Sequence, residues 1–88
     1  DLTKDMIGQD VTVFGRIGFV DQSSAGTFFE LEDQGCRVGA MVMQSDLEGW
    51  PQDIQGGLEM GTSVQAMGKV GEFQGMLELQ VFVLQLLE

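Results

Sequence analysis

Hydrophobic and polar side chains alternate along most of the chain. In one segment Phe29 and Leu31 fall on one side. Phe28, Glu30 and Glu32 fall on the other, which is the spacing of a strand with one face toward a core. The same period predicts further strands over residues 10–20, 36–43, 62–73 and 76–86. The pattern therefore predicts an all-β domain with five strands.

Glycines and short polar clusters punctuate these strands. Residues 33–35 (DQG) and 74–75 (QG) have the composition of tight hairpin turns, and residues 21–26 form a longer turn cluster. Glycines at 15, 18, 68 and 71 interrupt the strands themselves. Isolated glycines within a strand indicate bulges or bends, as a small barrel requires.

Two segments predict helical turns. Residues 1–9 form a lead-in with one helical turn that ends at Gly8. After the third strand, Ser45 is expected to be an N-cap with Glu48 as its capping-box partner. Trp50 and Pro51 are expected to limit or re-route that helix. The predicted barrel core consists of Val13, Phe29, Leu31, Val38, Ala40, Val64, Leu77, Leu79 and Val81.

The composition of the chain argues against several classes of function. The 88 residues make one domain, expected to be a piece of a larger protein. Fourteen acidic residues face four basic ones, and the net charge of −10 repels phosphate backbones. With no histidine and a single cysteine, Cys36, we expect no metal site, no cofactor and no His-dependent catalysis. No apolar run reaches the roughly 18–20 residues that cross a bilayer, so no membrane partner is expected. The location stays unknown, with the cytoplasm favoured.

The strand segments together resemble the oligonucleotide/oligosaccharide-binding (OB) fold of tRNA anticodon-binding and replication-protein modules. The resemblance rests on VTVFGRI (11–17), GTFFELED (26–33), VGAMV (38–42), GTSVQAMGKV (61–70) and EFQGMLEL (72–79). It implies a closed, five-stranded Greek-key barrel with strand order 1-2-3-5-4-1 and one short helix between strands 3 and 4. It also implies that single-stranded DNA or RNA binds across strands 2 and 3, between the 1–2 and 4–5 loops.

The resemblance carries over to three residues. It implies that Phe28 stacks on a base, that Arg16 is the cation after the first-strand glycine, and that Phe73 is the aromatic residue of the 4–5 loop. One position departs from the family, because Glu32 stands where family members commonly carry an arginine.

The residues themselves add further candidates and alternatives. Arg37, Met41 and Lys69 are candidate ligand contacts, and Met43 joins Arg37 and Met41 in a candidate apolar patch for a partner. Trp50 is a less favoured ligand contact. Each has a structural alternative: the cations pair with nearby acids, Trp50 seals a barrel end, the methionines lie under a loop, and Phe28 is covered.

The leading hypothesis is a non-catalytic module that binds single-stranded nucleic acid. Its binding in isolation is expected to be weak because the domain is strongly acidic. The alternative is a protein-interaction or structural OB domain, with a protein or another domain of the same chain as its partner. Catalysis or cation binding by Glu30, Glu32 and Asp33 is not favoured, because no further ligands cluster with them. The position of the cations relative to Phe28 separates the two hypotheses.

Overall fold

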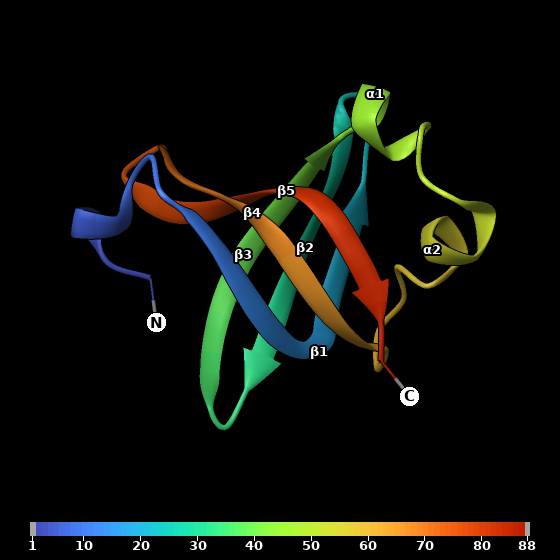
Figure 1. The fold of residues 1–88 in the computed structure, drawn as a ribbon, viewed down its shortest axis with the longest axis horizontal. Helices are drawn as coiled ribbons and strands as arrows, with labels where there is room; N and C mark the ends of the chain where they lie inside the picture. The colour runs from blue at the N-terminus through green and yellow to red at the C-terminus, as the bar shows by residue number, and fades with distance from the viewer. Residues whose placement is uncertain (1, 88) are drawn as a thin grey trace.

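Five strands close into one barrel in the computed structural model, which describes residues 2–87. The order around the barrel is β1-β2-β3-β5-β4, and this confirms the predicted fold (Figure 1). Neighbouring strands are antiparallel except β3 and β5, which are parallel. The strands are β1 (Asp10–Gln22), β2 (Gly26–Asp33), β3 (Cys36–Met43), β4 (Ser63–Phe73) and β5 (Met76–Leu86), and the helices are η1 (Lys4–Met6), α1 (Gln44–Leu47) and α2 (Gln52–Gly56).

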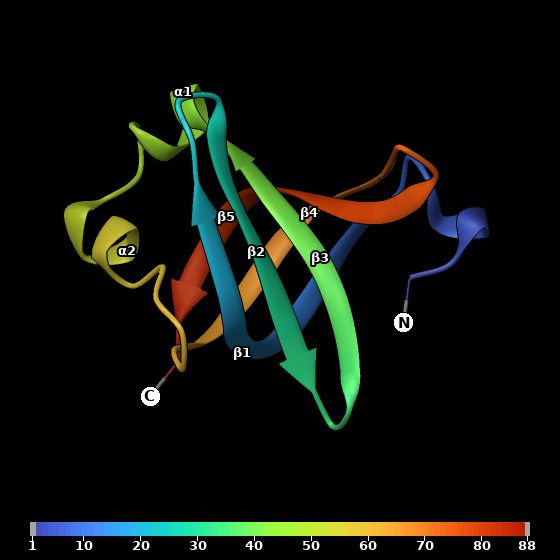
Figure 2. The ribbon, with the colours of Figure 1, turned by 180° about the vertical axis from the view of Figure 1, so that it is seen from behind.

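The long strand β1 belongs to two layers. Its first half pairs with β4 and its second half pairs with β2. The register shifts between Ile17 and Phe19, so Gly18 lies at the predicted bulge. Consequently β1, β4 and β5 face the viewer in Figure 1, whereas β2 and β3 face the viewer in Figure 2.

The core lies between these layers. Six of the nine predicted core residues are buried, and Val13, Val38 and Leu77 are partly buried against the same cluster. The prediction of the core is therefore confirmed. The cluster also contains Ile17, Val42, Leu47, Leu58, Ala66, Val70 and Leu84.

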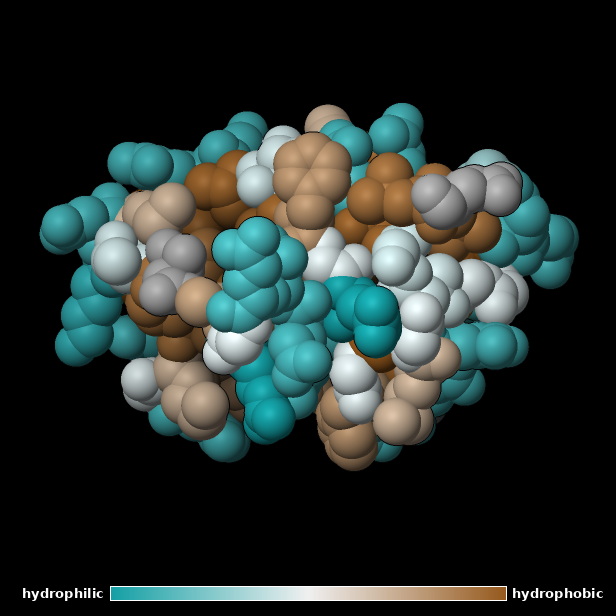
Figure 3. Space-filling view, turned by 90° about the horizontal axis from the view of Figure 1, so that it is seen from below, coloured by the Kyte–Doolittle hydropathy of each residue, from teal (hydrophilic) through white to brown (hydrophobic). Residues whose placement is uncertain are grey.

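The outward side of the β1–β4–β5 layer carries no charge at its centre. Phe14 lies opposite Gln65, which in turn lies opposite Gln85. In the neighbouring row across the three strands, Thr12 lies opposite Met67, which lies opposite Val83, and none of these side chains is charged. We call these six residues the neutral face. In Figure 3, which views the barrel from below, the side that faces the viewer in Figure 1 lies toward the top of the picture, where hydrophobic and hydrophilic side chains both appear.

The connection from β3 to β4 differs from the prediction. The expected N-cap at Ser45 is wrong, because α1 begins at Gln44 with Met43 in the cap position and no side-chain cap. The strand runs directly into the helix, and the Gln44 amide donates to the Ala25 carbonyl at 2.9 Å. Glu48 instead accepts from the Gln44 side chain at 3.2 Å.

The first helix ends at Leu47 and α2 begins at Gln52, so Trp50 and Pro51 lie between the two helices, where the sequence predicted that the helix would be limited or re-routed. There are thus two short helices where one was expected. Trp50 packs partly buried against the core, which agrees with its structural alternative. Within residues 2–87, no helix is long and apolar enough to span a membrane.

Two backbone features hold the barrel closed near the lead-in. The Gly8 amide donates to Val70 at 2.8 Å, and the Val70 amide donates to Gln9 at 2.9 Å, which ties the lead-in to β4. At Gly68 a Cβ atom would lie 2.3 Å from the Gln80 carbonyl oxygen, so β4 and β5 approach too closely there for any other residue.

Candidate binding groove

A groove opens where β3 and β5 part. These strands pair only at Ala40 with Leu79 and at Met41 with Gln80. Toward the start of each strand they separate, as Figure 2 shows. The cavity between them has a volume of about 450 Å³. Its lining comes from three places: Phe28 and Glu30 on β2, Gly39 and Met41 on β3, and Phe73, Gln74, Met76, Leu77 and Glu78 on the β4–β5 hairpin.

Phe28 forms one wall of this groove. It is partly exposed and lies directly opposite Met41 on β3. Its ring lies beside Gly39, where an added Cβ would be 3.4 Å from Cζ. The ring also meets Phe19 edge to face, with 6.5 Å between centroids and 64° between planes. These contacts hold the ring in place and leave part of it open to the groove.

The β4–β5 hairpin forms the other wall. Gln74 and Gly75 both have positive φ, 53° and 80°, which is the backbone of the predicted tight turn. The turn leaves Phe73 61% exposed and Met76 72% exposed. An aromatic and a thioether side chain therefore stand free beside Phe28.

Carboxylates complete the groove. Glu30 and Glu78 both line it, and no basic side chain does. Burial raises the pKa of the Glu78 carboxyl, because the partly apolar surroundings disfavour its charged form. Among the residues that the structure describes, no cluster of three or more acidic or cysteine side chains could hold a metal ion.

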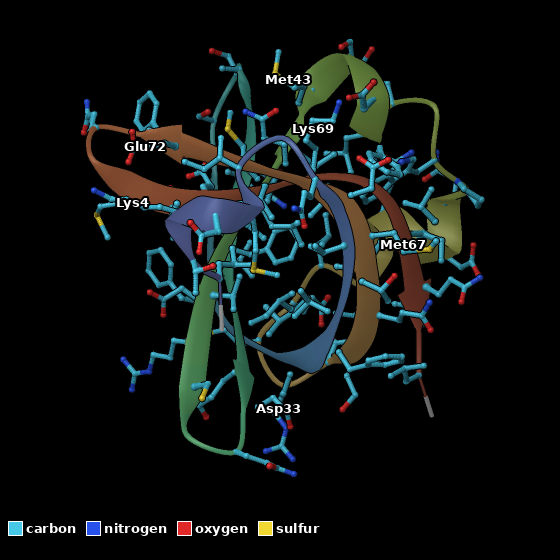
Figure 4. The ribbon with its side chains drawn as sticks, turned by 60° about the vertical axis from the view of Figure 1, so that its left-hand side comes forward. Lys4, Asp33, Met43, Met67, Lys69 and Glu72 are labelled. Carbon is cyan, nitrogen blue, oxygen red and sulfur yellow. The ribbon has the colours of Figure 1, made fainter. Side chains whose placement is uncertain are left out.

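The three strand cations lie outside the groove. Arg37 Nε donates to Glu32 Oε2 at 3.3 Å, in an exposed ion pair. Arg16 lies opposite Glu32 across β1 and β2, and it lines a separate cavity. Lys69 lies with Met43 at the α1 end, whereas Asp33 lies at the far end of the barrel (Figure 4).

The structure thus brings together three of the six predicted contact residues: Phe28, Met41 and Phe73. None of Arg16, Arg37 and Lys69 lines the groove, but Arg37 shares a neighbouring cavity with Glu30, and Lys69 shares another with Met41. Whether any of the six contacts a ligand stays a prediction. The sequence interpretation missed Met76, Leu77 and Glu78. The Gln74–Gly75 turn is a signal that they lie beside Phe73, but it does not place them beside Phe28.

Comparison with known proteins identifies the domain. No family model matches the chain. The chloroplastic/mitochondrial asparagine–tRNA ligase of Arabidopsis thaliana is 33% identical over 70 residues, which cover 78% of this chain and 12% of the ligase. The asparaginyl-tRNA synthetase of Pyrococcus horikoshii, complexed with asparaginyl-adenylate, has a TM-score of 0.80 and 20% identity. That match covers 96% of this chain and 20% of the synthetase. The chain therefore has the OB fold and is similar, over most of its length, to one part of asparaginyl-tRNA synthetases.

The OB domain has a structural neighbour of another kind. The OBody AM1L10, bound to hen egg-white lysozyme, has a TM-score of 0.80 and 17% identity. The match covers 99% of this chain and 87% of the OBody. The same barrel therefore occurs both as a small part of a synthetase and as most of a chain that is bound to a protein.

Proposed function

We propose that this OB domain is a non-catalytic module that binds single-stranded RNA of the tRNA class within a larger protein. The observation that carries the proposal is the groove, which places Phe28, Met41 and Phe73 together in an OB barrel. Stacking on a free aromatic side chain contributes about 1–3 kcal/mol per base. The relatives support the ligand class, because their names describe tRNA ligases of which this chain matches a small part.

The charge distribution makes this binding weak. Each phosphate contact contributes about −0.7 to the slope of log affinity against log salt for single strands. With at most three strand cations available, and Arg37 already paired with Glu32, we expect a slope no steeper than about −2. At physiological salt the dissociation constant should be no tighter than about 10⁻⁵ M.

A titration of a fluorescently labelled single-stranded RNA, followed by anisotropy, tests this function. Phe28→Ala should weaken binding about tenfold, by the loss of one stacked base. Phe14→Ala is the matched control, because Phe14 is 53% exposed on the neutral face and does not line the groove. It should leave the affinity unchanged. Unchanged binding by Phe28→Ala would show that the groove is not the binding site.

The affinity itself separates the two functional classes. Submicromolar and strongly salt-dependent binding would mean that local cations outweigh the acidic field. It would remove the protein-interaction alternative. No binding even at low salt would instead contradict the nucleic-acid function.

The alternative function is a protein-interaction module, and one specific observation favours it. The groove presents two carboxylates and no cation, which repels phosphate and attracts a basic partner. The lysozyme-bound OBody is an example of a protein-bound chain with this fold.

A further inference from the structure

The groove lining holds two carboxylates and no basic side chain, although Glu30 also lines a neighbouring cavity with Arg37. Within residues 2–87 the structure contains a single ion pair, between Arg37 and Glu32, and neither residue lines the groove. Glu30 and Glu78 come from different strands, β2 and β5, and both are only partly exposed. The groove is thus a partly desolvated site with two negative charges and no basic side chain in its lining.

The rest of the lining is aromatic and apolar. Phe28 and Phe73 offer ring surface, and Met41, Met76 and Leu77 offer aliphatic surface. A cation that is also planar can stack on such rings while its N–H groups point at carboxylates. Among protein side chains the arginine guanidinium combines both properties, whereas the lysine ammonium is a strongly hydrated point charge.

A free strand edge runs beside the groove. β3 pairs with β2 along its whole length, but with β5 only at Ala40 and Met41. In the described part of the chain, 2–87, residues 36–39 therefore have no strand partner on the side that faces the β4–β5 hairpin. An extended segment can add to such an edge through main-chain hydrogen bonds.

We infer from this geometry that the groove binds an arginine side chain carried on an extended segment of a basic protein partner. The guanidinium stacks against Phe28 and Phe73 and donates to Glu30 and Glu78, while the partner backbone follows the free edge of β3. The inference goes beyond RNA binding, because it gives the groove a second class of ligand. The two ligands share Phe28 but respond in opposite ways to the carboxylates.

Three capped peptides of the form Val-Thr-X-Thr-Val test the inference, with arginine, lysine or neutral citrulline at X. Binding to the 88-residue chain is followed by chemical-shift changes of ¹⁵N-labelled protein. We expect the arginine peptide to bind in the millimolar to submillimolar range, with shifts centred on Gly39 and Glu78. We expect the lysine peptide to bind several-fold more weakly, and the citrulline peptide not to bind.

Conservative variants identify the residues responsible. Glu30→Gln and Glu78→Gln should each weaken the arginine peptide about tenfold, because each removes a charge-assisted hydrogen bond. Glu59→Gln is the control, since it removes the same charge from an exposed residue outside the groove. Equal weakening by Glu59→Gln, unchanged binding by the two groove variants, or equal binding of the citrulline peptide would overturn the inference.

The same variants keep this inference separate from the RNA function. Glu30→Gln and Glu78→Gln should bind RNA as well as the parent chain or better, because each removes negative charge beside the phosphates. Phe28→Ala should weaken both ligands. A failure with the arginine peptide therefore leaves the RNA result standing, and a failure with RNA leaves the arginine site standing.

Discussion

The two outer faces of this barrel differ in the side chains that they present to solvent. The neutral face, on β1, β4 and β5, shows Phe14, Met67 and Val83 among uncharged polar residues. The opposite face carries Phe28 together with Glu30 and Glu32. Both faces have aromatic rings, but the groove that holds Phe28, Phe73 and two carboxylates without a basic side chain lies on the second.

This difference shows that the net charge of −10 does not describe either face by itself. A uniformly acidic domain would repel nucleic acid from every direction. Here two carboxylates line the groove, whereas the neutral face has no charge at its centre. We therefore expect the choice between the two proposed ligands to depend on a few groove residues, and variants at those residues test whether the two faces differ in binding.

The largest expected effect distinguishes two adjacent phenylalanines. Phe29→Ala should lower the free energy of unfolding by about 3–5 kcal/mol, because Phe29 is fully buried. Phe28→Ala should lower it by only about 1 kcal/mol, from its edge contact with Phe19. Urea denaturation of the two variants measures this difference. An equal loss would make Phe28 a core residue and contradict its role as a stacking platform.

A charge reversal on the groove side sharpens the comparison. Glu32→Arg restores the cation that OB-family members commonly carry there and frees Arg37 from its ion pair. We expect RNA to bind about tenfold more tightly, with a salt slope steeper by about 0.7 for each new phosphate contact. The stability should change by less than about 1 kcal/mol, because the pair is exposed.

Asp53→Arg is the control for that reversal. It makes the same change in net charge on α2, at an exposed residue that does not line the groove. Its effect on RNA affinity should be clearly smaller. If both variants tighten binding equally, net charge alone controls the affinity and the contrast between the faces has no functional meaning.

The raised pKa of Glu78 predicts a smaller effect that depends on pH. The Glu78 carboxyl binds a proton more readily in the folded chain than in the unfolded chain, where its pKa is near 4.5. The ionised carboxylate therefore destabilises the fold above its raised pKa, and the penalty disappears as the pH falls through that pKa. Glu78→Gln should raise Tm slightly at neutral pH and leave it unchanged at about pH 4. An equal shift at both pH values would indicate a packing effect.

The smallest effect is expected on the neutral face. Phe14→Ser replaces an exposed ring, so stability should change by no more than about 0.5 kcal/mol. Affinity for RNA and for the arginine peptide should stay the same. A loss of affinity for either ligand would show that the binding surface extends around the barrel to this face.

The register of β2 with β3 and the outward face of β2 could be predicted from the sequence. The two-residue turn at Gln34 and Gly35 places Asp33 opposite Cys36 and therefore Glu32 opposite Arg37. The ion pair between them follows from that register. The outward position of Phe28 likewise follows from the buried positions of Phe29 and Leu31.

The helical connection could be predicted only in part. Trp50 and Pro51 mark the break between α1 and α2 because proline restricts the preceding residue and lacks an amide proton. The start of α1 could not be predicted from Ser45 and Glu48. It depends on the hydrogen bond from the Gln44 amide to Ala25, a residue of the β1–β2 loop.

The sequence by itself determined the strands, their inward faces and the tight turns, because a period of two and the turn residues act between near neighbours. Only the tertiary structure decided which side chains share the groove. The parallel pairing of β3 with β5 rests on two residue pairs, Ala40 with Leu79 and Met41 with Gln80. No local pattern specifies that register, because it results from closing the whole barrel. Closure brings Glu78 beside Phe28 and leaves Arg16 and Lys69 outside the groove lining.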